Sequence, residues 1–159
     1  MATTLIVYYS LEGNVDFVAR SLAKELGADI FRLETVKEYP KKGLAKFFHG
    51  GKDAVANTMP ELKALPPNFA SYSTVVLGTP VWASRPAAPL NTLLSQTDFA
   101  GKKVAAFASS AGGSAAKTFE SLAAKLKNAT LGATASFKNT ARNPDAAQEQ
   151  IKAFAAALA

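Results

Sequence analysis

One turn and two short loops of this chain carry residue types suited to binding anions or planar rings. Ser10–Asn14 (Ser-Leu-Glu-Gly-Asn) separates the apolar run Leu5–Tyr9 from a segment of helical periodicity that begins at Val15. A turn that runs straight into a helix leaves backbone N–H groups unpaired, and the helix dipole adds partial positive charge there. Ser10 and Asn14 add side-chain donors. The turn therefore predicts a phosphate site, with an ordinary turn capped by Ser and Asn as the alternative.

The loop Thr79–Ala83 (Thr-Pro-Val-Trp-Ala) contains Trp82, the only tryptophan of the chain. A tryptophan in a proline-framed loop at the end of a strand is costly to leave in water, so we expect its indole to form a platform for a planar ring. Packing of Trp82 into the core is the alternative. The third segment, Ser109–Gly113, consists of small residues that would let the backbone approach the edge of such a ring.

The three segments are predicted to follow strands of one sheet. Apolar runs without clean alternation, such as Leu5–Tyr9, are typical of strands buried on both faces, which belong to parallel sheets. Helical segments alternate with these runs. The expected strands are 5–9, 29–33, 73–78, 103–108 and a weaker edge strand at 130–137. Five helices are expected. The first begins at Val15 with Gly27 as C-cap, and the second spans about 43–56, where Gly50-Gly51 are expected to interrupt it or end it early. The third opens among the prolines after Thr79, the fourth starts at a Ser114 cap, and the fifth starts at Asn143-Pro144.

This alternation predicts an α/β fold, a doubly wound five-stranded parallel sheet of order 2-1-3-4-5 with helices on both faces. In such sheets ligands bind in a crevice outside the carboxyl ends of the strands. Residues 10–15, 79–84 and 109–113 would meet there. A ligand with a phosphate at one end and a large heteroaromatic ring at the other fits this layout, and flavin mononucleotide (FMN) is such a ligand.

Length and composition set further bounds. The 159 residues are most simply one domain, 1–159, and 48% apolar residues argue against disorder. The chain has no cysteine, which excludes disulfides and sulfur-ligated metal sites, and a single histidine, His49, argues against histidine-based ones. We expect no secretory leader, because the first residues lack a basic segment followed by an apolar one, and no apolar run of about 20 residues occurs in the sequence. We therefore expect a cytoplasmic protein that does not bind membranes.

The net charge of +6 raises the question of nucleic acid. Lysines and arginines are scattered along the chain, and no basic stripe with interleaved aromatics or known nucleic-acid motif occurs. We predict no nucleic-acid partner. The positive charge is expected instead to favour acidic partners or anionic substrates.

These residues give the chain a resemblance to the flavodoxin family that covers nearly its whole length. Tyr9–Val15 (Tyr-Ser-Leu-Glu-Gly-Asn-Val) is similar to the family's phosphate loop, S/T-x-T/E-G-N-T, and Gly78–Ala83 to the loop that stacks an aromatic ring on the flavin. The resemblance implies a short-chain, flavodoxin-like FMN-binding protein. The cofactor-binding positions that it implies are Ser10, Leu11, Glu12, Gly13, Asn14, Val15, Thr79, Pro80, Val81, Trp82, Ala83, Ser109, Ser110, Ala111, Gly112 and Gly113.

The chain departs from the family pattern in three ways. Val15 stands where the family has Thr, which removes one hydroxyl from the phosphate loop. The third loop lacks the aromatic residue that many flavodoxins place on the other ring face. The chain is basic, whereas electron-carrying flavodoxins tend to be acidic. A basic frame is expected to stabilise an anionic reduced flavin and so to raise its final reduction potential.

No acid–base pair, catalytic triad or metal-ligand set occurs, so we predict no catalytic residue and no metal. This absence agrees with a protein in which a bound cofactor performs the chemistry. The leading hypothesis is an FMN protein that carries electrons between redox partner proteins. The alternative is an FMN-dependent NAD(P)H:quinone oxidoreductase acting on small quinone-like acceptors. A third hypothesis is a module that keeps the fold without the cofactor.

Overall fold

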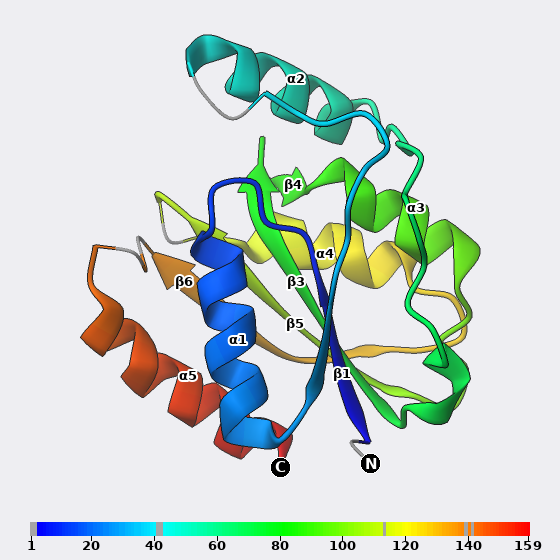
Figure 1. The fold of residues 1–159 in the computed structure, drawn as a ribbon, viewed down its shortest axis with the longest axis vertical. Helices are drawn as coiled ribbons and strands as arrows, with labels where there is room; N and C mark the ends of the chain where they lie inside the picture. The colour runs from blue at the N-terminus through cyan, green and yellow to red at the C-terminus, as the bar shows by residue number, and fades with distance from the viewer. Residues whose placement is uncertain (1–2, 41–42, 113, 139, 141) are drawn as a thin grey trace.

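The computed structural model describes residues 3–40, 43–112, 114–138, 140 and 142–159, with the side chains of helix α2 described from His49 onward. A central sheet has the strand order β2-β1-β3-β5-β6, and β4 pairs with β3 beside this path (Figure 1). The strands are β1 (Thr4–Tyr8), β2 (Asp29–Arg32), β3 (Thr74–Trp82), β4 (Arg85–Pro86), β5 (Lys103–Ser110) and β6 (Leu131–Lys138). The helices are α1 (Asn14–Leu26), α2 (Gly43–Val55), α3 (Ala88–Gln96), α4 (Ala116–Lys125) and α5 (Pro144–Leu158), with a short 3-10 helix at Phe69–Ser71.

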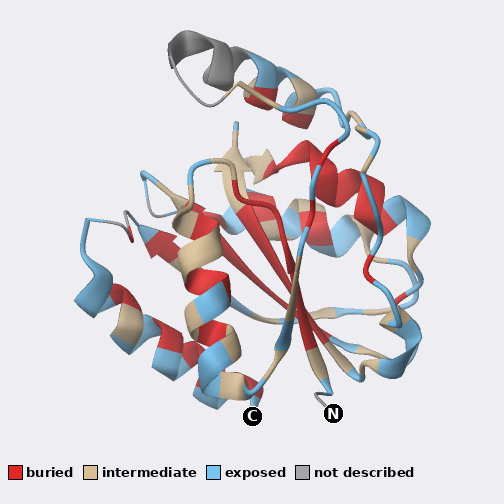
Figure 2. Cartoon of the chain, viewed as in Figure 1, coloured by how far each residue is buried: buried red, intermediate tan, exposed pale blue. Residues whose placement is uncertain are grey.

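Helices cover both faces of the sheet. Alternate residues of β1 show why: Ile6 and Tyr8 enter one core with α1 and α5, whereas Leu5 and Val7 enter a second core with α3 and α4. Figure 2 shows β1, β3 and β5 buried over most of their length between these two layers, whereas β2 and most of β6 are half-buried or exposed. The parallel pairings β1–β2, β1–β3, β3–β5 and β5–β6 bring the carboxyl ends of the strands to one edge. Helix α2 lies at that edge, apart from both layers (Figure 1).

The main fold prediction is confirmed. The five parallel strands follow the predicted doubly wound order, and β6 lies at an edge. Gly27 closes α1 in the left-handed region at φ 64°, and the Asn143 side chain accepts a hydrogen bond from the Ala146 N–H at the start of α5. Within the described residues, no helix combines the length and the hydropathy needed to cross a bilayer.

Two helix predictions are wrong. Gly50 and Gly51 do not interrupt or end α2, which continues to Val55. Tertiary packing overrides the low helix propensity of glycine here, because Gly50 lies close against Trp82. Ser114 does not cap α4: the cap position is Ala115, and no side chain caps it. Ser114 lies one residue too early for that role.

The hairpin formed by β3 and β4 is absent from the sequence-based prediction. Val81 pairs with Pro86, and Trp82 pairs with Arg85. The two residues of the connecting turn, Ala83 and Ser84, have φ values of 51° and 64°. Positive φ at both positions is the geometry of a type I′ hairpin turn, which Asn-Gly normally supplies. Ala-Ser gives no such signal, and the left-handed region costs about 1–2 kcal/mol for each non-glycine residue.

Replacing Thr118 by valine is expected to stabilise the protein by about 1 kcal/mol. The hydroxyl of Thr118 in α4 is fully buried and has no hydrogen-bond partner among the described residues. Valine has nearly the same shape and removes the cost of burying that hydroxyl. Urea unfolding of the two proteins measures the difference.

Thr79→Val is the control for this prediction. The Thr79 hydroxyl, equally buried, donates to the Pro80 carbonyl at 2.7 Å and accepts from the Ala87 N–H at 2.9 Å. Its loss leaves a buried N–H unpaired and should cost about 1–3 kcal/mol. Equal destabilisation by both substitutions would contradict the account of Thr118.

Candidate functional site

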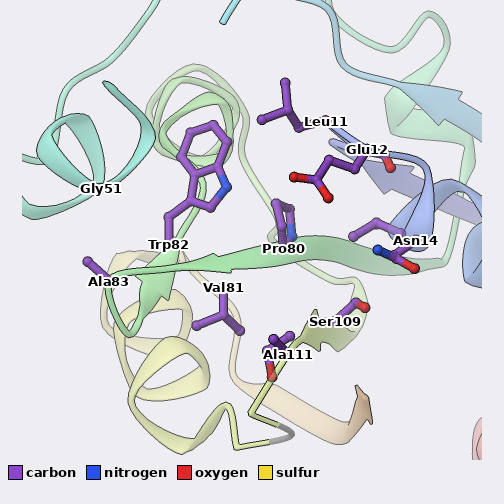
Figure 3. A pocket seen from close by; sticks show the side chains of 13 residues that line it. Leu11, Glu12, Asn14, Gly51, Pro80, Val81, Trp82, Ala83, Ser109 and Ala111 are labelled. Atoms are coloured by element: carbon purple, nitrogen blue, oxygen red, sulfur yellow. The ribbon is translucent and has the colours of Figure 1, made fainter. Parts of the chain in front are cut away.

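A crevice of about 520 Å³ opens at the carboxyl ends of the strands. Its volume lies in the range of small-molecule sites. Figure 3 shows the lining side chains converging from the turn after β1, from β3 and from the end of β5. The residues that line it are Ser10, Leu11, Glu12, Asn14, Val15, Gly51, Pro80, Val81, Trp82, Ala83, Ser109, Ser110 and Ala111.

Ser10 organises the turn that leads into α1. The buried Ser10 Oγ accepts hydrogen bonds from the N–H groups of Gly13 and Asp16, each at 3.1 Å. Gly13 precedes the helix with φ 105°, a conformation that glycine adopts readily. The Gly13 amide is thus committed to Ser10. The Ser10 hydroxyl accepts both bonds and has no acceptor for its own proton among the described residues, so that proton could be donated to an anion in the crevice.

A charged network lies beside this turn. Tyr8 Oη donates to Asp16 Oδ1 at 2.5 Å, and Arg20 Nε donates to Asp16 Oδ2 at 2.9 Å. An Arg32 amino group donates to the Ser10 carbonyl at 2.7 Å, and its guanidinium lies 3.7 Å from Asp16 Oδ1. The ends of β1, α1 and β2 are therefore tied together around Ser10. Sequence spacing could have suggested the Asp16–Arg20 pair, which is one helical turn apart, but not Arg32.

This network shifts two pKa values. Burial, and then the hydrogen bond to Asp16, raises the pKa of Tyr8 to about 12, so Tyr8 remains a proton donor at neutral pH. Burial alone would raise the pKa of Asp16. The hydrogen bonds from Tyr8 and Arg20 and the positive charges of Arg20 and Arg32 outweigh burial and lower it.

The lowered pKa of Asp16 predicts a pH-dependent loss of stability. Below the ordinary carboxyl value of 3.8, the unfolded chain binds a proton at Asp16 before the folded protein does. The stabilisation is complete above that pH and is lost as the pH falls through the lower folded pKa. Asp16→Asn keeps an acceptor for Tyr8 but cannot titrate. We expect the unfolding free energy of the wild type to fall more steeply with acid than that of D16N, measured by urea unfolding at several pH values; parallel curves would contradict this.

An aromatic cluster surrounds Trp82, the one member of the cluster that lines the crevice. The rings of Trp82 and Tyr9 lie 5.6 Å apart at 81°, and those of Trp82 and Tyr39 lie 5.0 Å apart at 64°. Tyr39 Oη donates to Asp53 Oδ2 of α2 at 2.6 Å. Trp82 remains partly exposed and lines the crevice, while Tyr9 is buried as predicted. The indole is therefore held by its neighbours with part of its surface facing the crevice.

The third loop begins later than predicted, because β5 continues to Ser110. Ser109 pairs with Pro80 of β3 on one side and with Phe137 of β6 on the other. Pairing on both sides fixes the end of the strand at the crevice. The exposed Ala111 then places a small side chain at the rim (Figure 3).

Most residues predicted for the site lie at the crevice. Three predicted positions do not line it: Gly13, whose amide bonds Ser10; Thr79, whose side chain is fully buried; and Gly112. Gly113 lies outside the described residues. Val15 lines the crevice but is also buried in the core with α5, so valine at this position contributes to packing. Sequence reasoning missed Gly51.

A second, polar pocket of about 300 Å³ lies across Ser10 and Leu11 from the first. Its two cations already have partners: Arg32 bonds the Ser10 carbonyl, and Lys63 lies 3.5 Å from the Glu34 carboxylate. Within the described part of the chain, no group of three acidic, histidine or cysteine residues is arranged to hold a metal ion.

Comparisons with known proteins agree with this architecture. The chain is similar in fold to the flavoprotein from Lactobacillus acidophilus NCFM solved in complex with FMN, at 20% identity over 89% of this chain and 96% of that chain, TM-score 0.73. The NMR structure of the apo-form of the flavoprotein from the same organism gives 23% identity, 90% and 97% coverage and TM-score 0.63. Oxidised Flavodoxin 2 from Bacillus cereus gives 20% identity, 98% and 97% coverage and TM-score 0.57. The family model for flavodoxin matches residues 3–153, and the chain therefore belongs to the flavodoxin family.

Proposed function

We propose that the crevice binds FMN, with the phosphate at the turn before α1 and the flavin ring against Trp82. One observation carries this proposal: a single crevice joins the N-terminal end of α1 to the indole of Trp82. A helix N-terminus favours an anion, and an indole favours a planar ring. Membership of the flavodoxin family and the FMN complex of the Lactobacillus acidophilus flavoprotein support the same ligand.

The chain's own residues would divide the binding work. Ser10 would donate its hydroxyl proton to the phosphate, and Arg32 would keep the turn in place through the Ser10 carbonyl. Figure 3 shows the Glu12 carboxylate turned toward the crevice, so it would accept hydrogen bonds from hydroxyl groups rather than approach the phosphate. Bound FMN supplies one- and two-electron transfer. The protein would exclude water from one ring face with Trp82 and Pro80.

Titration of the cofactor-free protein with FMN and with riboflavin tests the proposal. The two ligands share the ring and differ in the phosphate. We expect FMN to bind at least about 100-fold more tightly, since several charge-assisted hydrogen bonds of roughly 1.5–3 kcal/mol each would be missing with riboflavin. Ser10→Ala should weaken FMN binding and leave riboflavin binding nearly unchanged. Equal affinity for both ligands would rule out the phosphate site, and no binding of either would rule out the cofactor.

We propose electron transfer between redox proteins as the role of this cofactor. A second candidate is an FMN-dependent NAD(P)H:quinone oxidoreductase. It is favoured by the lining of the crevice: among the described lining residues Trp82 is the only aromatic one, and Ser109, Ser110 and Ala111 have small side chains. A small acceptor could then reach the flavin. Steady-state oxidation of NAD(P)H with added quinone separates the two, because a pure carrier should show almost none.

We further propose that the redox partner is acidic, because the chain carries a net charge of +6. Electron transfer to an acidic partner should then slow as ionic strength rises. The final reduction potential of the bound flavin should also lie above those of acidic flavodoxins. A potential as low as theirs would refute the charge argument. The cytoplasm remains our prediction for location, testable by cell fractionation.

A further inference from the structure

Helix α2 meets the aromatic wall of the crevice at Gly50. A Cβ atom added to Gly50 would lie 3.1 Å from Cδ2, 3.2 Å from Cε2 and 3.3 Å from Cε3 of Trp82. Cδ2 and Cε2 are the two atoms shared by the fused rings. An atom in the plane of the indole cannot come equally close to both from outside the rings. The backbone of Gly50 therefore lies over one face of the indole, and Figure 3 shows the ring between α2 and the side chains of Leu11 and Glu12.

Contact with Trp82 explains why α2 has glycine at position 50, but not why it has glycine at position 51. Glycine inside a helix is less stable than alanine, so each member of the pair weakens α2. At Gly50 a methyl group would press on the indole at distances tighter than ordinary contact. At Gly51 the added Cβ would lie 3.8 Å from the Ala83 Cβ, which is ordinary contact. Close approach to Trp82 therefore requires glycine at Gly50 and not at Gly51.

A second contact ties α2 to the same indole. Asp53 lies one helical turn after Gly50, on the same side of α2. Its carboxylate accepts the 2.6 Å hydrogen bond from Tyr39, whose ring lies 5.0 Å from that of Trp82 at 64°. Burial, and then Asp53, raises the pKa of Tyr39, which keeps its phenol in the donating form. Trp82 is thus held by a backbone over one face and by a hydrogen-bonded tyrosine at a steep angle.

We propose that α2 is a clamp that sets the plane of Trp82 through Gly50 and through the Tyr39–Asp53 hydrogen bond. With one indole face covered by Gly50, a flavin ring cannot stack on that face. Gly50, Tyr39 and Asp53 are then positioning residues, since they act on the cofactor through Trp82. The effect of these residues on cofactor affinity rests on the proposed binding of FMN. Their effect on the orientation of Trp82 does not.

The fluorescence of the cofactor-free protein tests the structural part. Trp82 is the only tryptophan, so its emission reports this site alone. We expect Gly50→Ala to shift the emission maximum and to change quenching by acrylamide. Gly51→Ala adds the same methyl group one residue later and should leave the emission as in the wild type. Both substitutions raise helix propensity equally, so a difference between the two variants cannot come from helix stability. Equal emission from G50A and the wild type would overturn the clamp. Far-UV circular dichroism establishes that both variants are folded.

FMN affinity tests the functional part through a double-mutant cycle. We expect Gly50→Ala to weaken FMN binding by up to about tenfold, the range of a lost ring–ring contact. In a Trp82→Phe background the smaller ring leaves room for the methyl group, so the same substitution should change affinity less than twofold. A full effect of G50A in both backgrounds would mean that Gly50 does not act through the indole.

The hydrogen bond is tested separately. Tyr39→Phe keeps the ring and removes the donor, and Asp53→Ala removes the acceptor; both should alter Trp82 emission in the cofactor-free protein. Asp53→Asn retains an acceptor oxygen and should restore the wild-type spectrum. Unchanged emission in Y39F and D53A would overturn this half of the clamp. Should wild-type protein fail to bind FMN while the emission changes occur, the proposed function would fail and the clamp would stand as a structural feature.

Discussion

Gly78→Ala is expected to destabilise the protein by about 3 kcal/mol. Gly78 lies in β3 between Tyr8 of β1 and Phe107 of β5. A Cβ atom at Gly78 would come within 2.4 Å of Phe107 Cζ and 2.9 Å of both Cε atoms. Phe107 is fully buried and packs at right angles to Phe137, with ring centroids 6.1 Å apart, so it has little space to withdraw. The strain would fall on the centre of the sheet.

Urea unfolding of three variants checks this expectation. Gly112→Ala is the control, because a Cβ there meets nothing within 4 Å, and its effect should stay within about 0.5 kcal/mol. Phe107→Leu in the G78A background shortens the obstructing side chain. The loss of unfolding free energy in the double variant should therefore be smaller than the sum of the losses in the two single variants. Strict additivity would contradict the clash with Phe107.

Trp82→Ala is expected to weaken FMN binding by about 10- to 100-fold, equivalent to roughly 1.4–2.8 kcal/mol. The substitution removes the platform from the crevice wall and with it the apolar area that a flavin ring would cover. Trp82→Phe keeps a smaller platform and should give an intermediate loss. The dissociation constants are measured by titration of the visible spectrum of the flavin.

Riboflavin gives this prediction its control. Because the ring is common to both ligands, Trp82→Ala should weaken riboflavin and FMN by the same factor, whereas Ser10→Ala should act on FMN alone. If W82A bound FMN as the wild type does, the flavin ring would have to lie elsewhere. A loss for FMN but not for riboflavin would mean that the substitution disturbs the phosphate turn instead.

The parallel sheet was predictable because its central strands β1, β3 and β5 are buried on both faces. Leu5, Ile6 and Val7 face different cores yet are all apolar, which gives a run without alternation. The β3–β4 hairpin was not predictable. Ala83 and Ser84 adopt left-handed conformations that their side chains disfavour, so only the surrounding structure can impose the turn. The turn propensities of Ala and Ser do not indicate such a constraint.

The part of the site that lies at the ends of the strands was predictable. Residues directly after β1, within β3 and at the end of β5 must meet at one edge, whatever their side chains. The contributions of Gly51, Tyr39 and Asp53 depend on where α2 settles, and no spacing along the chain encodes that. The sequence also does not reveal the role of the Thr79 side chain, whose hydroxyl bonds the backbone of Pro80 and Ala87.

The parallel arrangement of the strands also separates the crevice from both described ends of the chain. β1 begins at Thr4 and runs toward the crevice, while α5 ends where the Leu158 carbonyl accepts a 3.5 Å hydrogen bond from Lys103, at the start of β5 (Figure 1). An attachment at either end would therefore project from the side opposite the mouth. Immobilising the protein on a support through Ala159 would leave the crevice open to solution, so that a docking partner could be titrated against an oriented layer.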